Sequence, residues 1–409
     1  MNMKKMITLG GMMAAASALA VGCSTEKESQ TVSPAAVQET AENPSQATDG
    51  QNSADGAQVP DDVKNASVLR DAFQHDFTVG VAVNSASLND KEDMEFIARN
   101  FNSITMENAM KPEGLMDGQA TENSKDGMPE IKTKELDRLL SAAQEQGLKV
   151  RGHCLVWHNQ TPEWFFSKDY EPSKGFVDKE TMKKRMEAYI KKVLTYCQEK
   201  YPGVVYAWDV VNEAVGDDNN YRTKSNWYEI YGDESYITDA FTFARQYAAP
   251  DVKLFYNDYN EYVPAKRETI MQLLKGLHEK GLVDGMGMQS HWDMEYPSVG
   301  MLEQALEEYG TLDGLEIQLT EIDMHNTDDS EEGYQKQAER YKEFFETILK
   351  AKRTGKANVT NVTVWGLTDD VSWLTGFKGE TSYPLLFDEN YKQKPCFDSI
   401  LAAAKQSYE

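Results

Sequence analysis

The sequence predicts an α/β fold, a (β/α)8 TIM barrel formed as a single domain by residues 62–409. Three observations support this prediction. Short apolar runs alternate with longer amphipathic runs after residue 62, the short runs number eight, and polar residues follow the end of most of them. Strands that alternate with helices are typical of a parallel sheet, and eight such repeats are enough to close the sheet into a barrel.

The eight expected strands are short segments rich in β-branched, aromatic and other apolar residues. They are 77–83, 101–106, 149–156, 204–211, 252–257, 285–290, 315–322 and 361–367. The run at 204–211 is apolar almost throughout, which is typical of a parallel strand that is buried on both faces.

The segments between these strands show the 3.6-residue periodicity of helices that pack against a sheet. The clearest expected helices are 133–147, 179–200, 234–248 and 332–355. Gly147 provides a C-terminal stop for the first of them. Strand and helix thus alternate along the whole of 62–409.

The residues before the barrel predict an export signal followed by a tether. Residues 1–23 combine Lys4 and Lys5 with an uncharged run and end in "LAVGC", which resembles a bacterial lipoprotein signal peptide with Cys23 as the lipidated residue. Residues 24–61 are rich in Ser, Thr, Gln and Pro and lack aromatic residues, so we expect a disordered linker. The expected location is extracytoplasmic: lipid-anchored at the bacterial cell surface, or secreted.

Charge and cysteine content exclude several classes of partner. The formal net charge of -25 argues against nucleic acid, because phosphate contacts need clustered Lys and Arg. This net charge is compatible with a neutral substrate. Association with a membrane is expected only through the lipid anchor. The remaining cysteines, Cys154, Cys197 and Cys396, have no metal-ligand spacing and are expected as buried free thiols. No cofactor and no metal are predicted, and the chain is expected to be a monomer.

Polar and aromatic side chains follow seven of the eight expected strands. In a barrel these positions meet at one face, where barrel enzymes place their sites. The residues are Glu107, Asn108 and Lys111; His153, Trp157 and Gln160; Asn212 and Glu213; Tyr256, Asn257 and Asp258; Gln289, His291 and Trp292; Glu321 and Asp323; and Trp365, Asp369, Asp370 and Trp373.

Two of these residues, Glu213 and Glu321, follow strands that face each other across the mouth of a closed barrel. Paired carboxylates on either side of a bond are the requirement for glycoside hydrolysis, with one group as proton donor and the other as nucleophile or base. Nearby aromatic rings can stack on sugars. A metal site built from His153, His291 and carboxylates is the chemical alternative, but no short metal-binding spacing is present.

Eight sequence blocks resemble, in order, those of the glycoside hydrolase family 10 endo-β-1,4-xylanases. The resemblance covers about residues 62–405 and is specific because all eight blocks occur in sequence. The blocks are "ENAMKPE" (107–113), "GHCLVWHNQTPEWF" (152–165), "WDVVNEA" (208–214), "LFYNDYN" (254–260), "GMGMQSHW" (285–292), "LTEIDM" (319–324), "VWGLTDDVSWL" (364–374) and "PLLFDENYKQKP" (384–395).

The resemblance implies a retaining enzyme that cleaves internal β-1,4-xylosidic bonds of xylan and xylo-oligosaccharides. It implies Glu213 as acid/base, Glu321 as nucleophile, Asn212 as a contact to the sugar 2-hydroxyl, and His291 with Asp323 as support for the nucleophile. Glu107, Asn108, Lys111, His153, Trp157, Gln289, Trp365 and Trp373 would line the glycone side, with Tyr256 and Asn257 towards the leaving group. The strand-end pattern adds Gln160 to the substrate-binding set.

Two alternatives keep part of this pattern. A retaining barrel β-glucanase would also carry both glutamates, although the second and third strand blocks favour xylan. A non-catalytic carbohydrate-binding barrel would keep the aromatic and amide side chains but has no need for both Glu213 and Glu321.

Overall fold

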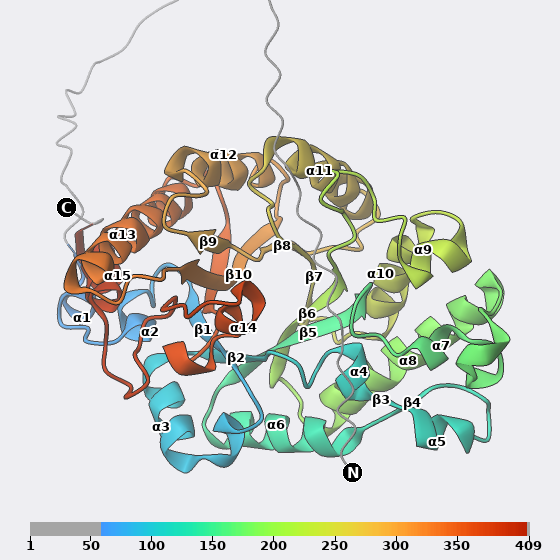
Figure 1. Cartoon of the computed structure of the whole chain (residues 1–409). Helices are drawn as coiled ribbons and strands as arrows, with labels where there is room; N and C mark the ends of the chain where they lie inside the picture. The colour runs from blue at the N-terminus through green and yellow to red at the C-terminus, as the bar shows by residue number, and fades with distance from the viewer. Residues whose placement is uncertain (1–58, 407–409) are drawn as a thin grey trace, which may run out of the picture. The chain divides into compact units, whose positions relative to one another are not determined.

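The structure is a computed structural model that describes residues 59–406, and these residues form a closed parallel barrel ringed by helices (Figure 1). The strands follow the order β11-β1-β2-β5-β6-β7-β8-β10, and pairing of β11 with β10 closes the barrel. The predicted fold class is confirmed. The barrel strands are β1 (Thr78–Val83), β2 (Ser103–Met106), β5 (Lys149–Trp157), β6 (Val205–Asn212), β7 (Lys253–Asp258), β8 (Gly285–Met288), β10 (Glu316–His325) and β11 (Val359–Val364).

Each expected strand contains or overlaps one of these barrel strands. Three further strands lie outside the barrel ring. The short β9 (His291–Asp293) pairs in parallel with the end of β10, and β3 (Met116–Asp117) pairs antiparallel with β4 (Glu130–Ile131). These additions were not expected because they are only two or three residues long.

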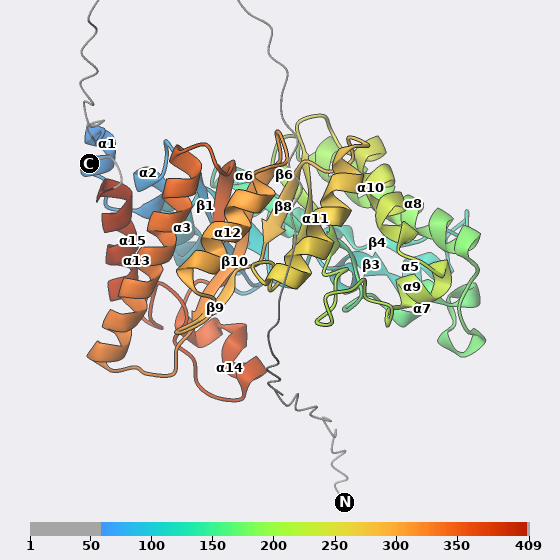
Figure 2. The ribbon, with the colours of Figure 1, turned by 90° about the horizontal axis from the view of Figure 1, so that it is seen from above.

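Helices cover the outside of the barrel, and at least one helix separates each pair of successive barrel strands (Figures 1 and 2). Figure 2 shows α13, α12 and α11 in succession along one side, and the four helices predicted most clearly correspond to α6, α8, α10 and α13. The longer helices are α3 (Lys91–Asn100), α6 (Thr133–Glu145), α8 (Lys179–Lys200), α10 (Ser235–Tyr247), α11 (Pro264–His278), α12 (Val299–Tyr309), α13 (Glu331–Arg353) and α15 (Pro395–Gln406).

Short helices occupy the connecting segments. They are α1 (Asp61–Lys64), α2 (Leu69–Ala72), α4 (Pro112–Leu115), α5 (Gly118–Glu122), α7 (Glu163–Phe166), α9 (Asn226–Tyr231) and α14 (Trp373–Lys378), with 3-10 turns η1 (Ser87–Asn89), η2 (Lys168–Tyr170), η3 (Pro172–Lys174) and η4 (Asp369–Val371).

Local sequence explains where several barrel helices begin. The side chains of Asp90, Asp178, Ser298 and Ser330 each accept a hydrogen bond from a backbone N–H in the first turn of α3, α8, α12 and α13. Such caps satisfy N–H groups that have no partner within the helix. The helix starts are therefore encoded by single polar residues.

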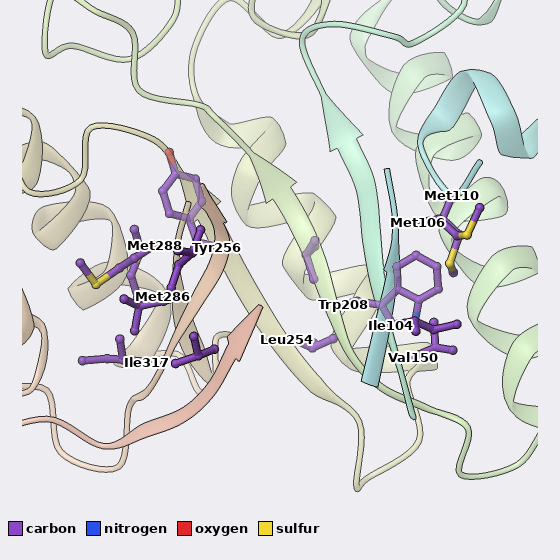
Figure 3. Packing of buried hydrophobic residues seen from close by; sticks show 14 of the residues in the cluster. Ile104, Met106, Met110, Val150, Trp208, Leu254, Tyr256, Met286, Met288 and Ile317 are labelled. Atoms are coloured by element: carbon purple, nitrogen blue, oxygen red, sulfur yellow. The ribbon is translucent and has the colours of Figure 1, made fainter. Parts of the chain in front are cut away.

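The hydrophobic core fills the layer between the strands and the helices (Figure 3). Trp208 of β6 is 1% exposed, and its ring lies against Gly152 of β5. A Cβ atom on Gly152 would lie 2.3 Å from a carbon of that ring, so only glycine allows the indole to pack there. Gly152 and Trp208 are paired in the register of β5 and β6, the two strands that carry Trp157 and Asn212 to the mouth.

The predicted signal peptide (1–23), with Cys23, and the predicted linker (24–61), except for its last three residues, lie outside the described residues. Between residues 59 and 406, no helix is both long and apolar enough to cross a membrane. Cys154, Cys197 and Cys396 are buried free thiols, as expected.

Candidate active site

The strand register places the expected site residues at the C-terminal mouth of the barrel. Trp157 of β5 pairs with Asn212 of β6, and Asn212 pairs with Asn257 of β7, so the three residues lie at one level of the sheet. Glu213 follows Asn212 directly, and Glu321 lies on β10. The ends of parallel strands thus bring together residues that are more than 100 positions apart in the chain.

Glu321 is 5% exposed and lies between an amide and an imidazole. Asn257 Nδ2 donates to Glu321 Oε1 at 2.8 Å, and His291 Nε2 lies 3.4 Å from Oε2. Burial by itself raises the pKa of this carboxyl, but the His291 hydrogen bond, the His153 and His291 imidazoles and the Asn257 amide outweigh it and lower the pKa to about 2. Glu321 is therefore ionised at neutral pH, as a nucleophile must be.

Asp323 holds the imidazole of His291 in place. Its Oδ1 lies 2.9 Å from His291 Nδ1, and its Oδ2 accepts a 2.8 Å hydrogen bond from Trp373 Nε1. Burial by itself lowers the pKa of His291, but the carboxylates of Asp323 and Glu321 outweigh it and raise the pKa to about 10. His291 is thus an imidazolium that lies between the carboxylates of Asp323 and Glu321.

Glu213 has different neighbours, which are uncharged hydrogen-bond donors. Trp157 Nε1 donates to Oε2 at 2.9 Å, while Gln289 Nε2 and Asn212 Nδ2 lie 2.9 and 3.3 Å from Oε1. His158 Nδ1 lies 3.9 Å from Oε2. Burial and the charges of Arg222 and Lys266 lower the pKa of His158 to about 4, so this imidazole is neutral at pH 7. The two glutamates therefore differ in their surroundings: an imidazole and an amide contact the Glu321 carboxyl, whereas an indole and two amides contact the Glu213 carboxyl.

A chain of amides connects the two glutamates. Gln289 Nε2 contacts both Glu213 Oε1 and Asn212 Oδ1, and Asn257 Nδ2 contacts both Asn212 Oδ1 and Glu321 Oε1. Thr320 Oγ1 donates to Asn257 Oδ1 at 2.6 Å and fixes the orientation of that amide. A movement of either carboxyl would therefore disturb hydrogen bonds of the other.

The remaining predicted residues line the mouth around this centre. Lys111 Nζ lies 4.8 Å from the centre of the Trp157 ring and 3.4 Å from Asn108 Oδ1, which also accepts from Gln160 at 3.3 Å. Burial raises the pKa of Glu107 to about 7, against the charge of Lys111.

Further aromatic rings lie among the predicted site residues. The His153 and Trp365 rings meet edge to face with centroids 5.5 Å apart. The ring centroids of His291 and Trp373 are 5.0 Å apart. Rings and polar donors that converge in this way suit a carbohydrate.

Two predicted substrate contacts are wrong in this structure. Tyr256 and Asn257 are both 0% exposed and cannot line the leaving-group side. Successive side chains of a strand point to opposite faces. Asn257 points into the barrel, where it binds Glu321, and Tyr256 packs with the apolar core, in register with Met286 of β8 (Figure 3).

Some residues of the site were not predicted. His158 stands beside Glu213, and its position directly after Trp157 in the "VWHNQ" stretch could have indicated it. Arg222 Nε donates to the backbone carbonyl of Glu213 at 3.1 Å from a loop whose sequence has no regular pattern. Below the mouth, the buried Arg151 binds Asp209, whose Oδ2 lies 2.9 Å from His153 Nδ1.

Comparison with known proteins agrees with this geometry. The profile of "Glycosyl hydrolase family 10" matches residues 68–403. An endo-1,4-β-xylanase of Geobacillus stearothermophilus is 38% identical over 346 residues, which cover 80% of this chain and 96% of that protein. The chain belongs to glycosyl hydrolase family 10.

Other family 10 proteins extend the comparison. Endo-1,4-β-xylanase B of Butyrivibrio fibrisolvens is 46% identical over 342 residues, and the match spans 82% of this chain but only 53% of that longer protein. The solved structure of endo-1,4-β-D-xylanase 10B from Clostridium thermocellum, complexed with xylohexaose, has a TM-score of 0.76 and 36% identity; the match covers 83% of this chain and 68% of that one.

Proposed function

We propose that this family 10 chain is an endo-1,4-β-xylanase that hydrolyses internal bonds of xylan with retention of configuration. The observation that carries the proposal is the pair of glutamates at the barrel mouth, joined by a chain of amides: the pKa of Glu321 is lowered to about 2 by an imidazole and an amide, and the Glu213 carboxyl accepts hydrogen bonds from Trp157 and Gln289. Relatives named endo-1,4-β-xylanase and a structural neighbour complexed with xylohexaose support the choice of substrate.

The first step forms a glycosyl-enzyme. Glu321 Oε attacks the anomeric carbon, the bond from that carbon to the glycosidic oxygen breaks, and the proton of Glu213 moves to the leaving oxygen. His291 and Asn257 must release part of their hold on Glu321 as its charge moves into the new ester bond. In the second step Glu213 takes a proton from water, the hydroxide attacks the same carbon, and Glu321 leaves as a carboxylate.

Activity on two polymers tests the substrate. Reducing-sugar release from xylan is expected to exceed release from carboxymethyl cellulose, and the first product is expected by NMR to have the β configuration. Preferential cleavage of cellulose or mixed-linkage glucan would favour the β-glucanase alternative, and binding without cleavage would favour a carbohydrate-binding barrel. An α-configured first product would exclude retention.

We also propose that Cys23 is lipidated and that the barrel acts as a monomer outside the cytoplasm. The "LAVGC" sequence and the Ser/Thr/Gln/Pro-rich stretch after it support the anchor. The full-length protein is expected in the membrane fraction, and Cys23→Ala is expected to release it or leave it unprocessed. Recovery of the wild type entirely in the medium, with another N-terminus, would contradict lipidation, and light scattering of the barrel tests the monomer.

A further inference from the structure

The backbone at Glu213 has an unusual conformation. β6 ends at Asn212, and Glu213 has φ of 55°, in the left-handed region that non-glycine residues seldom adopt. Such a conformation persists only where the surrounding structure holds it. The direction of the Glu213 side chain therefore depends on whatever holds this turn.

Hydrogen bonds hold the peptide groups on both sides of Glu213. Its own N–H donates to the carbonyl of Asn257 at 2.8 Å, and its carbonyl accepts from Arg222 Nε at 3.1 Å. The next two N–H groups, of Ala214 and Val215, both donate to the hydroxyl oxygen of Tyr256, at 3.1 and 3.2 Å. The Val215 N–H also lies 3.4 Å from Asp258 Oδ2, so Tyr256, with Asp258 behind it, holds the two peptides that follow the proposed acid/base.

The hydroxyl of Tyr256 makes every hydrogen bond that it can make, one as donor and two as acceptor. A tyrosine hydroxyl is expected to donate one hydrogen bond and can accept two. Tyr256 accepts from the two backbone N–H groups and donates to Asp258 Oδ2. Since Asp258 is 0% exposed, the donor direction of the hydroxyl is set towards a buried carboxylate.

Asp258 is in turn paired with a buried cation. Lys266 Nζ of α11 lies 2.8 Å from Asp258 Oδ1, and Lys266 is 1% exposed. Two charges are costly to remove from water, and a buried ion pair is often no more stabilising than apolar residues of similar size. A role in fixing a conformation is the better explanation for such a pair next to the active site.

We propose that Tyr256, oriented by the Asp258–Lys266 pair, is a positioning residue for Glu213 that holds the left-handed turn and so aims the acid/base carboxyl at the leaving oxygen. This assignment rests on the proposed function and extends it to a residue that does not touch the substrate. It also gives a role to the tyrosine that the sequence had placed in the leaving-group site.

The test compares leaving groups with one glycone. Phenyl β-xylobioside requires protonation of its leaving oxygen, whereas 2,4-dinitrophenyl β-xylobioside requires little. Tyr256→Phe keeps the ring and removes the hydroxyl. Its kcat/KM is expected to fall about 10²-fold for the phenyl substrate, the size of effect expected when a catalytic group is displaced, and only a few-fold for the dinitrophenyl substrate.

Tyr341→Phe is the matched control. Tyr341 is equally buried and donates one hydrogen bond to the carbonyl of Pro384, so the variant also loses a buried hydroxyl bond. Its ratio of the two kcat/KM values is expected to equal that of the wild type, whatever the change in thermal stability. An equal loss on both substrates in Tyr256→Phe would assign Tyr256 a purely structural role.

A double variant separates action through Glu213 from other effects. In a Glu213→Ala background, Tyr256→Phe is expected to change neither kcat/KM further, because the group it positions is absent. A further loss of 10-fold or more would overturn the proposal. A wild type that cleaves neither xylan nor the aryl substrates would overturn the proposed function, whereas a normal wild type with an unchanged ratio in Tyr256→Phe would overturn only the role of Tyr256.

Discussion

Replacement of His291 by Asn is expected to move the acid limb of activity to higher pH. His291 is the first of the groups that hold the pKa of Glu321 down, from an ordinary value of 4.5 to about 2. A difference of roughly 2.5 pKa units corresponds to about 3 kcal/mol in favour of the ionised carboxyl. Without the imidazolium, burial acts against the His153 imidazole and the Asn257 amide alone, and the pKa of Glu321 should rise towards its ordinary value.

The expected loss of activity follows from the ionised fraction of Glu321. At pH 3.5 a carboxyl with a pKa of about 2 is almost fully ionised, whereas one at 4.5 is ionised to only about 10%. Between pH 6 and pH 3.5, His291→Asn should therefore lose about 10-fold more kcat/KM than the wild type. At pH 6 and above, any loss reflects altered geometry and should not vary with pH.

The assay measures kcat/KM for 2,4-dinitrophenyl β-xylobioside from pH 3 to pH 7, with circular dichroism at each pH to confirm folding. His278→Asn is the control, because His278 is at the end of α11, and its Nε2 lies 2.9 Å from the backbone carbonyl oxygen of Asp313. Coincident acid limbs for His291→Asn and the wild type would refute the assignment of His291.

The same lowered pKa makes a stability prediction with a definite sign. A carboxyl whose pKa is lower in the folded protein stabilises that protein above its unfolded pKa, and the contribution disappears as pH falls through the folded value. Ionisation of Glu321 should therefore lose its stabilising effect between about pH 4.5 and about pH 2. Glu321→Gln should flatten that part of the urea-unfolding profile.

Three further predictions concern other parts of the barrel. Glu213→Ala should lower kcat/KM on phenyl β-xylobioside by about 10²–10⁴-fold. Azide should restore its turnover of the dinitrophenyl substrate and give a β-azide product. An α-azide product would mean that Glu213 is the nucleophile and Glu321 the acid/base. Burial raises the pKa of Glu107 to about 7, and a carboxylate accepts stronger hydrogen bonds than a protonated carboxyl group does. KM for xylo-oligosaccharides should therefore rise as pH falls from 8 to 6. Glu107→Gln should abolish that trend. Gly152→Ala places a methyl group 2.3 Å from the Trp208 ring and should destabilise the fold by about 1–3 kcal/mol in urea unfolding; an unchanged midpoint would show that the ring can move.

The barrel was predictable because its signals are local. Each strand is a short apolar run, the long helices show their own periodicity, and the caps of α3, α8, α12 and α13 are single Asp or Ser residues. Glu213 and Glu321 were predictable as a pair for the same reason, since both stand at the ends of recognisable strands and such ends meet in a barrel. These features need no knowledge of which distant residues touch.

The orientation of individual side chains was decided only by the tertiary structure. Register shifts interrupt the pairing of β5 with β6, β6 with β7 and β10 with β11, so simple alternation along the sequence does not tell which residue of a strand end faces the mouth. Tyr256 and Asn257 are adjacent, yet one holds the backbone after Glu213 and the other binds Glu321. The sequence determined which residues reach the mouth of the barrel, because strand ends are local features. The fold decided which of them face the substrate and which hold the catalytic groups, because that depends on neighbouring strands and on buried partners such as Asp258 and Lys266.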